Sequence, residues 1–145
     1  MLFGRKKRRI EHLLVVEDEP LVAFDTEHFL RESGFTIVAT VDSVVDATRI
    51  VEAGAPLDLV LADIRLSDGS GVEVARAAYA RGLPVLFVTG NCPADARALA
   101  AGCLGKPYPQ RDLLAAIDAI DSVLSGGAAP KRLPHSFSLF LDPSG

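Results

Sequence analysis

The chain has 145 residues, of which 49% are hydrophobic and 23% are charged, so it predicts one packed domain and excludes a globally disordered chain. Its formal net charge is −4, but five of its 15 basic residues lie together at positions 5–9. The rest of the chain has 10 basic against 19 acidic residues, a balance of −9, and such an acidic body is a poor general nucleic-acid binder.

Cysteine usage and hydropathy give the expected compartment. The two cysteines, Cys92 and Cys103, are too few for the disulfide framework of a small secreted protein. No apolar run reaches the roughly 18 residues that span a membrane, and no signal-peptide pattern follows the basic N-terminus. We therefore expect a cytoplasmic protein with no membrane partner.

Taken in chain order, the sequence starts with a basic arm at residues 1–11. Its GRKKRR run either binds nucleic acid or an anionic membrane or is simply solvated, and solvation is the preferred interpretation. After the arm, short apolar or β-branched runs alternate with segments that have helical spacing. The expected strands are 12–16, 35–40, 58–62, 83–88 and 103–104. The expected helices are 20–33, 44–53, 72–80, 94–101 and 112–124.

Strand and helix alternate five times, and the strands are apolar on both faces. This pattern predicts an α/β fold with a doubly wound, five-stranded parallel sheet and helices on each side. We expect one domain at 12–125, followed by a tail at 126–145 that contains proline and glycine. The alternation of Phe137, Leu139 and Leu141 leaves three interpretations of the tail open, which are an added strand, a segment docked in a groove and an unanchored end.

Polar residues follow the apolar strands at the points where the strands end. These residues are Glu17, Asp18, Asp63, Thr89 and Lys106. In open parallel sheets, ligands bind beyond the carboxyl ends of the strands. We therefore expect these side chains to converge at one edge of the sheet.

The expected cluster has the composition of a phosphoryl-transfer site. Its three carboxylates repel one another, and a hard divalent cation such as Mg²⁺ relieves that repulsion. A carboxylate such as that of Asp63 can attack phosphorus and form an aspartyl phosphate. The ammonium of Lys106 and the hydroxyl of Thr89 can then bind the oxygens of the transferred group.

This order of residues resembles the receiver domain of bacterial two-component response regulators, which has the flavodoxin-like fold. The stretch DIRLSDGSG at 63–71 is similar to the loop that follows the phosphoacceptor of that family, and the resemblance covers residues 12–125. It implies that Asp63 is phosphorylated by a histidine kinase or a histidine phosphotransfer protein. It also implies that Thr89 and Lys106 contact the phosphoryl oxygens.

The same resemblance implies the metal ligands. Glu17 and Asp18 would hold Mg²⁺ together with Asp63, and Arg65 would contribute its backbone carbonyl. The family catalyses only its own phosphorylation and dephosphorylation, so we do not expect an enzyme in the usual sense.

The sequence departs from the family at two places. Many receivers have an aromatic switch residue three positions before the lysine, where this chain has Cys103, and Tyr108 is a candidate substitute. Only 17 residues separate Thr89 from Lys106, which leaves little room for a full helix. The stretches PVLFVTGN at 84–91 and GKPY at 105–108 resemble the FAT GUY receivers of alphaproteobacteria, which implies kinases of the HWE type and a role in stress response.

Three hypotheses for the function follow. The preferred one is a single-domain response regulator that signals by protein contact or drains phosphate from a kinase, with phosphorylation-linked dimerisation left open. The second is a phosphorylation-independent interaction module on the same fold. The third is a phosphohydrolase of the haloacid dehalogenase type, but Pro20 stands where that family has its second aspartate.

Overall fold

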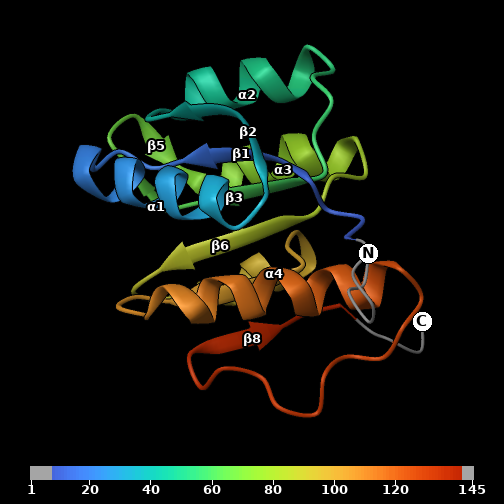
Figure 1. The fold of residues 1–145 in the computed structure, drawn as a ribbon. Coiled ribbons are helices and arrows are strands. Elements are labelled where there is room, and N and C mark those ends of the chain that lie inside the picture. Colours follow the sequence, from blue (N-terminus) through green and yellow to red (C-terminus); the bar gives the residue numbers. More distant parts are fainter. Residues whose placement is uncertain (1–7, 142–145) are drawn as a thin grey trace.

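The computed structural model describes residues 8–141 and contains a central sheet with helices on both sides (Figure 1). Five strands pair in parallel in the order β2-β1-β3-β6-β7. They are β1 (His12–Val16), β2 (Thr36–Val41), β3 (Leu59–Ala62), β6 (Val85–Thr89) and β7 (Gly102–Gly105). Each expected strand is confirmed to within two residues.

The strands form the centre of the core because both of their faces are apolar. In β1, Leu14 and Val16 pack into the cluster on one face of the sheet, and Leu13 and Val15 pack into the cluster on the other. All four side chains are at most 1% exposed. Burial on both faces is typical of a parallel sheet that is covered on each side.

The helices divide between the two faces. Helices α1 and α4 contribute to one apolar cluster, and α2, α3 and the short helix η1 contribute to the other. The four α-helices of the described chain are α1 (Pro20–Glu32), α2 (Val44–Glu52), α3 (Gly71–Ala80) and α4 (Gln110–Leu124). This arrangement confirms the flavodoxin-like, doubly wound α/β fold.

Side chains stabilise the starts of α2 and α3. Ser43 accepts a hydrogen bond from the N–H of Asp46, as expected for an N-cap, and Ser70 and Glu73 form a capping box at α3. Asp68 accepts hydrogen bonds from the N–H groups of Val44 and Val45, which hold the pKa of its carboxyl below the usual range. The loop after β3 is therefore tied to the start of α2.

The segment between β6 and β7 is short. It contains only η1, a 3₁₀ helix at Ala94–Ala98, within the range 94–101 where a brief helix was expected. A small antiparallel ribbon of β4 (Arg65–Leu66) and β5 (Gly69–Ser70) follows β3 and was not anticipated. Among residues 8–141, no helix is long and apolar enough to cross a membrane.

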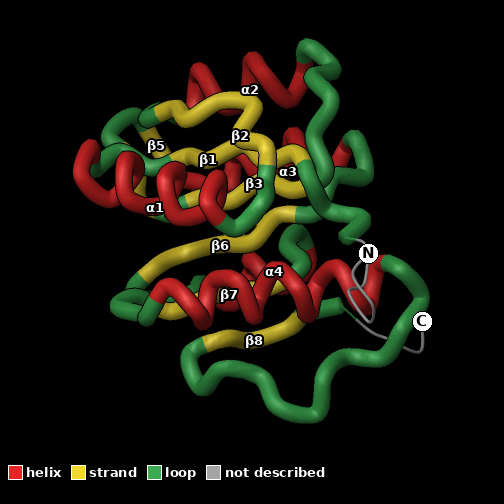
Figure 2. Tube along the Cα trace, in the orientation of Figure 1, coloured by secondary structure: helices red, strands yellow, loops and turns green. Residues whose placement is uncertain are grey.

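The sheet has a sixth strand, which corrects the expectation of five. Strand β8 (Phe137–Leu139) lies in the segment expected as a tail and pairs antiparallel with β7 (Figure 2). Of the three interpretations of this segment, strand addition is the one that the structure contains. Phe137 is 6% exposed, so the packed body reaches well beyond residue 125.

The described end of the basic arm is anchored. The N–H of Ile10 donates to Asp121 at 2.9 Å, and the Ile10 side chain is 1% exposed. Arg8 forms an ion pair with Asp118 at 3.0 Å. Residues 1–7, which include most of the GRKKRR run, lie outside the described residues.

Asp58 joins β1 to the start of β3. Its carboxylate accepts hydrogen bonds from the N–H groups of Glu11 and His12 and contacts Nδ1 of His12 at 3.1 Å. Burial alone would raise the pKa of Asp58, but these hydrogen bonds outweigh it and lower the pKa. The stabilisation is therefore present above the unfolded pKa of about 4 and is lost as the pH falls through the folded value.

We expect Asp58→Ala to lower the free energy of unfolding by about 1 kcal/mol at pH 7, because a charged acceptor is lost at a partly exposed position. Urea denaturation at pH 7 and below pH ~4 measures the free energy of unfolding of the variant and of the parent chain. The difference between the two free energies should shrink at the lower pH. An equal difference at both pH values would contradict a stabilising role for the ionised carboxylate of Asp58.

Candidate functional site

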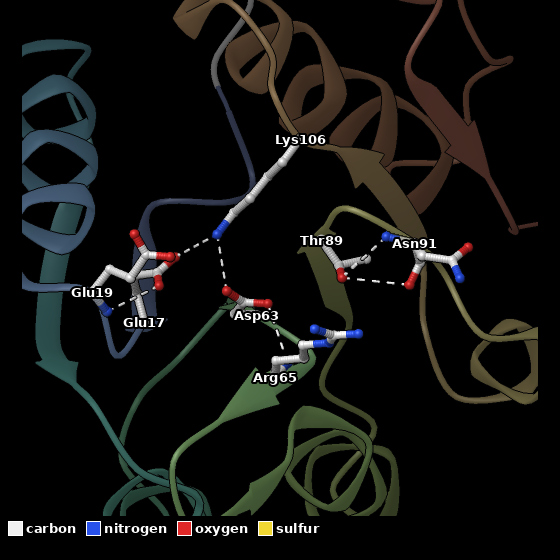
Figure 3. A network of polar contacts seen from close by, with 7 residues as sticks. All are labelled: Glu17, Glu19, Asp63, Arg65, Thr89, Asn91 and Lys106. Carbon is white, nitrogen blue, oxygen red and sulfur yellow. Dashed lines mark hydrogen bonds and ion pairs between the residues drawn. The ribbon is translucent and has the colours of Figure 1, made fainter.

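The candidate site lies where the parallel strands end. Glu17 and Asp18 follow β1, Asp63 follows β3, Thr89 ends β6 and Lys106 follows β7. The register aligns these ends, because Val16 pairs with Ala62 and Thr89 pairs with Gly105. The predicted convergence at one edge of the sheet is confirmed for these strand ends (Figure 3).

An ion triad occupies the centre of this edge. The Lys106 Nζ donates to Asp63 Oδ2 at 2.9 Å and to Glu17 Oε1 at 3.0 Å, as Figure 3 shows. Asp63 is 8% exposed and Glu17 is 6% exposed, so both carboxylates have lost most of their contact with solvent. A buried carboxylate needs such a partner because desolvation of an unpaired charge is costly.

Backbone groups bind the remaining oxygens of the two buried carboxylates. The N–H of Glu19 donates to Glu17 Oε2 at 3.1 Å, and the N–H of Arg65 donates to Asp63 Oδ1 at 3.2 Å. The turns that follow β1 and β3 therefore fix the orientation of the carboxylates. The sequence did not reveal these two contacts, because any residue except proline supplies a backbone N–H.

The protonation states follow from the triad. Burial raises the pKa of Glu17, and the hydrogen bonds from Lys106 and Glu19 offset only part of that effect. Burial alone would lower the pKa of Lys106, but its hydrogen bonds with Asp63 and Glu17 reverse the direction and raise the pKa. Lys106 is therefore a firmly protonated cation between two acids.

The acidic residues of the edge fit a divalent metal ion. Oxygens of Glu17, Asp18 and Asp63 lie within 4.8 Å of one another. The donors are all carboxylate oxygens, which suit a hard cation that keeps part of its water shell. Arg65 lies two residues beyond Asp63 on β4, and the role of its carbonyl stays a prediction.

Thr89 lies on the same edge but contacts its own loop. Its hydroxyl oxygen is 3.4 Å from both the backbone nitrogen and the backbone oxygen of Asn91, which are long separations for hydrogen bonds. The N–H of Lys106 donates to the carbonyl of Thr89 at 2.9 Å. The two residues are thus joined through the backbone, and the Thr89 hydroxyl is held only weakly.

The loop after Asp63 requires glycine at position 71. A Cβ atom at Gly71 would overlap the carbonyl oxygen of Asp63. The N–H of Gly71 also donates to Ile64 at 2.7 Å. The start of α3 therefore packs directly against the backbone of Asp63, which explains the glycine that ends the DIRLSDGSG stretch.

Cys103 lies at one of the places where the sequence departs from the resemblance, and Tyr108 is the candidate substitute for the aromatic residue that is missing there. Cys103 is buried, and its burial, together with the neighbouring thiol of Cys92, raises the pKa of its own thiol. Tyr108 lines a small cavity with Glu17 and Asp63, and burial raises the pKa of its hydroxyl. Tyr108 thus has an aromatic ring next to the ion triad, although its switch role stays a prediction.

Comparison with known proteins identifies the family. Residues 13–118 match the model of the response regulator receiver domain. The chain belongs to this family. Its members are parts of response regulators, which are mostly non-enzymatic signalling proteins in two-component systems.

Curated relatives and solved structures agree with this assignment. The chain is 29% identical over 115 residues to the phyllosphere-induced regulator PhyR of Methylorubrum extorquens, covering 72% of this chain and 41% of that protein. It is 32% identical over 128 residues to the sensory transduction protein RegX3 of Mycobacterium bovis, covering 79% of this chain and 56% of that protein. The chain therefore spans about half the length of these curated relatives.

Two solved receiver structures are similar in fold. The response regulator receiver protein of Sinorhizobium medicae has a TM-score of 0.67 and 25% identity, with 77% of this chain and 94% of that chain covered. The N-terminal domain of a response regulator/sensory box/GGDEF protein from Carboxydothermus hydrogenoformans has a TM-score of 0.72 and 28% identity, with coverage of 79% and 97%.

The ion triad predicts a stability change for Lys106→Ala. This variant leaves Glu17 and Asp63 buried without their cation, so we expect the free energy of unfolding to fall by about 3 kcal/mol at pH 7 without metal. Urea denaturation measures the loss, and Mg²⁺ should restore part of it. Lys131→Ala, at an exposed position, is the matched control. A loss at Lys106 no larger than that at Lys131 would show that the triad is not stabilising.

Proposed function

We propose that this protein is a response regulator that accepts a phosphoryl group on Asp63. The observation that carries the proposal is the position of Asp63, which is buried at the end of β3, 2.9 Å from the ammonium of Lys106 and beside two further carboxylates. A reactive carboxylate, an adjacent cation and an acidic metal site are what formation of an aspartyl phosphate requires.

The proposed reaction is a substitution at phosphorus. A carboxylate oxygen of Asp63 attacks the phosphorus of a phosphohistidine on a histidine kinase or a phosphotransfer protein. The P–N bond breaks as the P–O bond forms, and the imidazole nitrogen keeps the bonding electron pair. Hydrolysis of the resulting acyl phosphate returns Asp63 to its carboxylate form and releases inorganic phosphate.

The other residues of the site have supporting roles in this proposal. Lys106 transfers its hydrogen bond from Asp63 to a phosphoryl oxygen and offsets the added charge. The Thr89 hydroxyl, which is weakly held by Asn91, turns to donate to another phosphoryl oxygen. Glu17, Asp18, Asp63 and the carbonyl of Arg65 would hold Mg²⁺, which supplies further charge neutralisation when bound.

The proposal extends to the partners and the location. The phosphate donor is a histidine kinase, of the HWE type if the chain is a FAT GUY receiver, or a phosphotransfer protein. The output is a protein contact or the draining of phosphate from the kinase, with phosphorylation-linked dimerisation as a further state. The two free thiols fit a cytoplasmic location.

Intact-protein mass spectrometry after incubation with acetyl phosphate and Mg²⁺ tests the proposal. We expect the mass of one added phosphoryl group on the parent chain. Asp63→Ala and the parent chain with EDTA are the controls, and neither should gain mass.

Two further assays separate the rival functions. If acetyl phosphate adds no mass and histidine kinases do not phosphorylate the parent chain either, the phosphorylation-independent interaction module is favoured. Repeated turnover of p-nitrophenyl phosphate would instead indicate a phosphohydrolase, because a receiver releases only the phosphate that it carries.

A further inference from the structure

The edge of β7 is covered by the C-terminal segment of the chain. Strand β8 pairs with β7 so that Phe137 lies opposite Leu104 and Leu139 lies opposite Gly102. Two more backbone hydrogen bonds extend the pairing, from Gly105 to Ser136 at 2.9 Å and from Phe140 to Ala101 at 2.8 Å. Figure 2 shows that a long loop leads from the end of α4 back to this strand. Residues 136–140 therefore occupy an edge that would otherwise expose unpaired backbone groups.

The covered surface selects an extended segment with apolar residues at alternate positions. Phe137, Leu139 and Leu141 contact the apolar cluster beneath α1 and α4. Phe140 points to the opposite cluster, and the guanidinium of Arg97 lies 5.0 Å from the centre of its ring. The backbone of β7 thus supplies the pairing, and the two clusters supply the side-chain specificity.

Position 102 is adapted to this strand. A Cβ atom at Gly102 would lie 2.7 Å from Cε1 of Phe137 and 2.8 Å from the carbonyl oxygen of Ser138. The second distance is to backbone, which cannot move aside without unpairing β8. By contrast, a Cβ atom at Gly105 would lie 3.5 Å from Ser136, which is an ordinary contact.

The anchors of β8 lie on the two segments that carry the site. The hydrogen bond to Ser136 comes from Gly105, the residue before Lys106. The ring of Phe140 lies against Arg97, in the segment that follows Thr89. A group added to Asp63 would therefore crowd Lys106, whose neighbour Gly105 holds β8 in place.

The attachment of β8 is limited in extent. The strand has three residues and pairs on one side only, and no helix lies between the end of α4 and β8. Short strands that pair at one edge of a sheet open with a smaller free-energy cost than the core of a domain.

We propose that the β7 edge is a docking surface for an extended segment of a partner protein with apolar residues at alternate positions. Residues 137–141 hold this surface closed until a phosphoryl group on Asp63 releases them. The inference rests on the proposed function. Release follows because the phosphoryl group enters between Asp63 and Lys106, which are 2.9 Å apart, and so displaces Lys106 and the adjoining Gly105, which binds Ser136.

Hydrogen–deuterium exchange of the full chain tests the release. Backbone amides in 102–105 and 137–140 should exchange about tenfold faster after treatment with acetyl phosphate and Mg²⁺. Asp63→Asn is the control and should show no change. The intact mass of each sample reports phosphorylation independently. Absence of added mass, with no phosphorylation by a histidine kinase either, would remove the proposed function itself, whereas added mass with unchanged or slower exchange would overturn this inference alone.

Two glycine variants and a peptide test the surface. Gly102→Ala should exchange rapidly in 137–140 even without phosphate, whereas Gly105→Ala should resemble the parent chain. A fluorescent peptide with the sequence of residues 132–141 should bind the phosphorylated parent chain at least tenfold more tightly than the untreated chain. It should not bind phosphorylated Gly102→Ala. Equal binding of the peptide to the treated and untreated parent, or to treated Gly102→Ala, would overturn the docking surface.

Discussion

The ammonium of Lys106 lies between two carboxylates that the fold has buried, and the rest of the site depends on this contact. Glu17 and Asp63 are both less than a tenth exposed, and each needs a charge partner because desolvation of an unpaired carboxylate is costly. Lys106 supplies that partner in the resting protein. In the proposed function, the same cation would bind the phosphoryl group, so the interaction that pairs the carboxylates of the resting site would also prepare it for the transfer.

The parallel sheet makes this contact between residues far apart in the sequence. Glu17 and Lys106 are separated by 89 positions, yet they meet because their strands end at the same edge. The two turns that follow β1 and β3 complete the site with backbone N–H groups, and glycine at position 71 lets α3 pack against Asp63. Strand β8 adds a second link, because it is held by the residues next to Lys106 and beyond Thr89.

Much of this arrangement could be predicted from the sequence. The apolar runs placed the five parallel strands, and the polar residues after them predicted which side chains would converge. Asp68 binds the first N–H groups of α2 from the loop after β3, a contact that the sequence does not reveal because a cap from a distant loop leaves no local pattern. Strand β8 stayed one interpretation among three, because Phe140 breaks the alternation by packing on the opposite face from Phe137. The weak contact of Thr89 with Asn91 depends on a turn that no spacing indicates. The chemical roles of Asp63, Thr89, Lys106 and the metal ligands stay predictions.

The most direct test of phosphorylation at Asp63 is to identify the residue that carries the phosphoryl group and the type of bond that holds it. After incubation with acetyl phosphate and Mg²⁺, the chain would be reduced with sodium borohydride, which converts an aspartyl phosphate to homoserine and leaves free carboxylates unchanged. Peptide sequencing by mass spectrometry then locates the converted residue. Homoserine at position 63 alone is the predicted result. Homoserine at Asp18 or another aspartate, or a phosphorylated chain with none, would contradict the assignment of Asp63 as the acceptor.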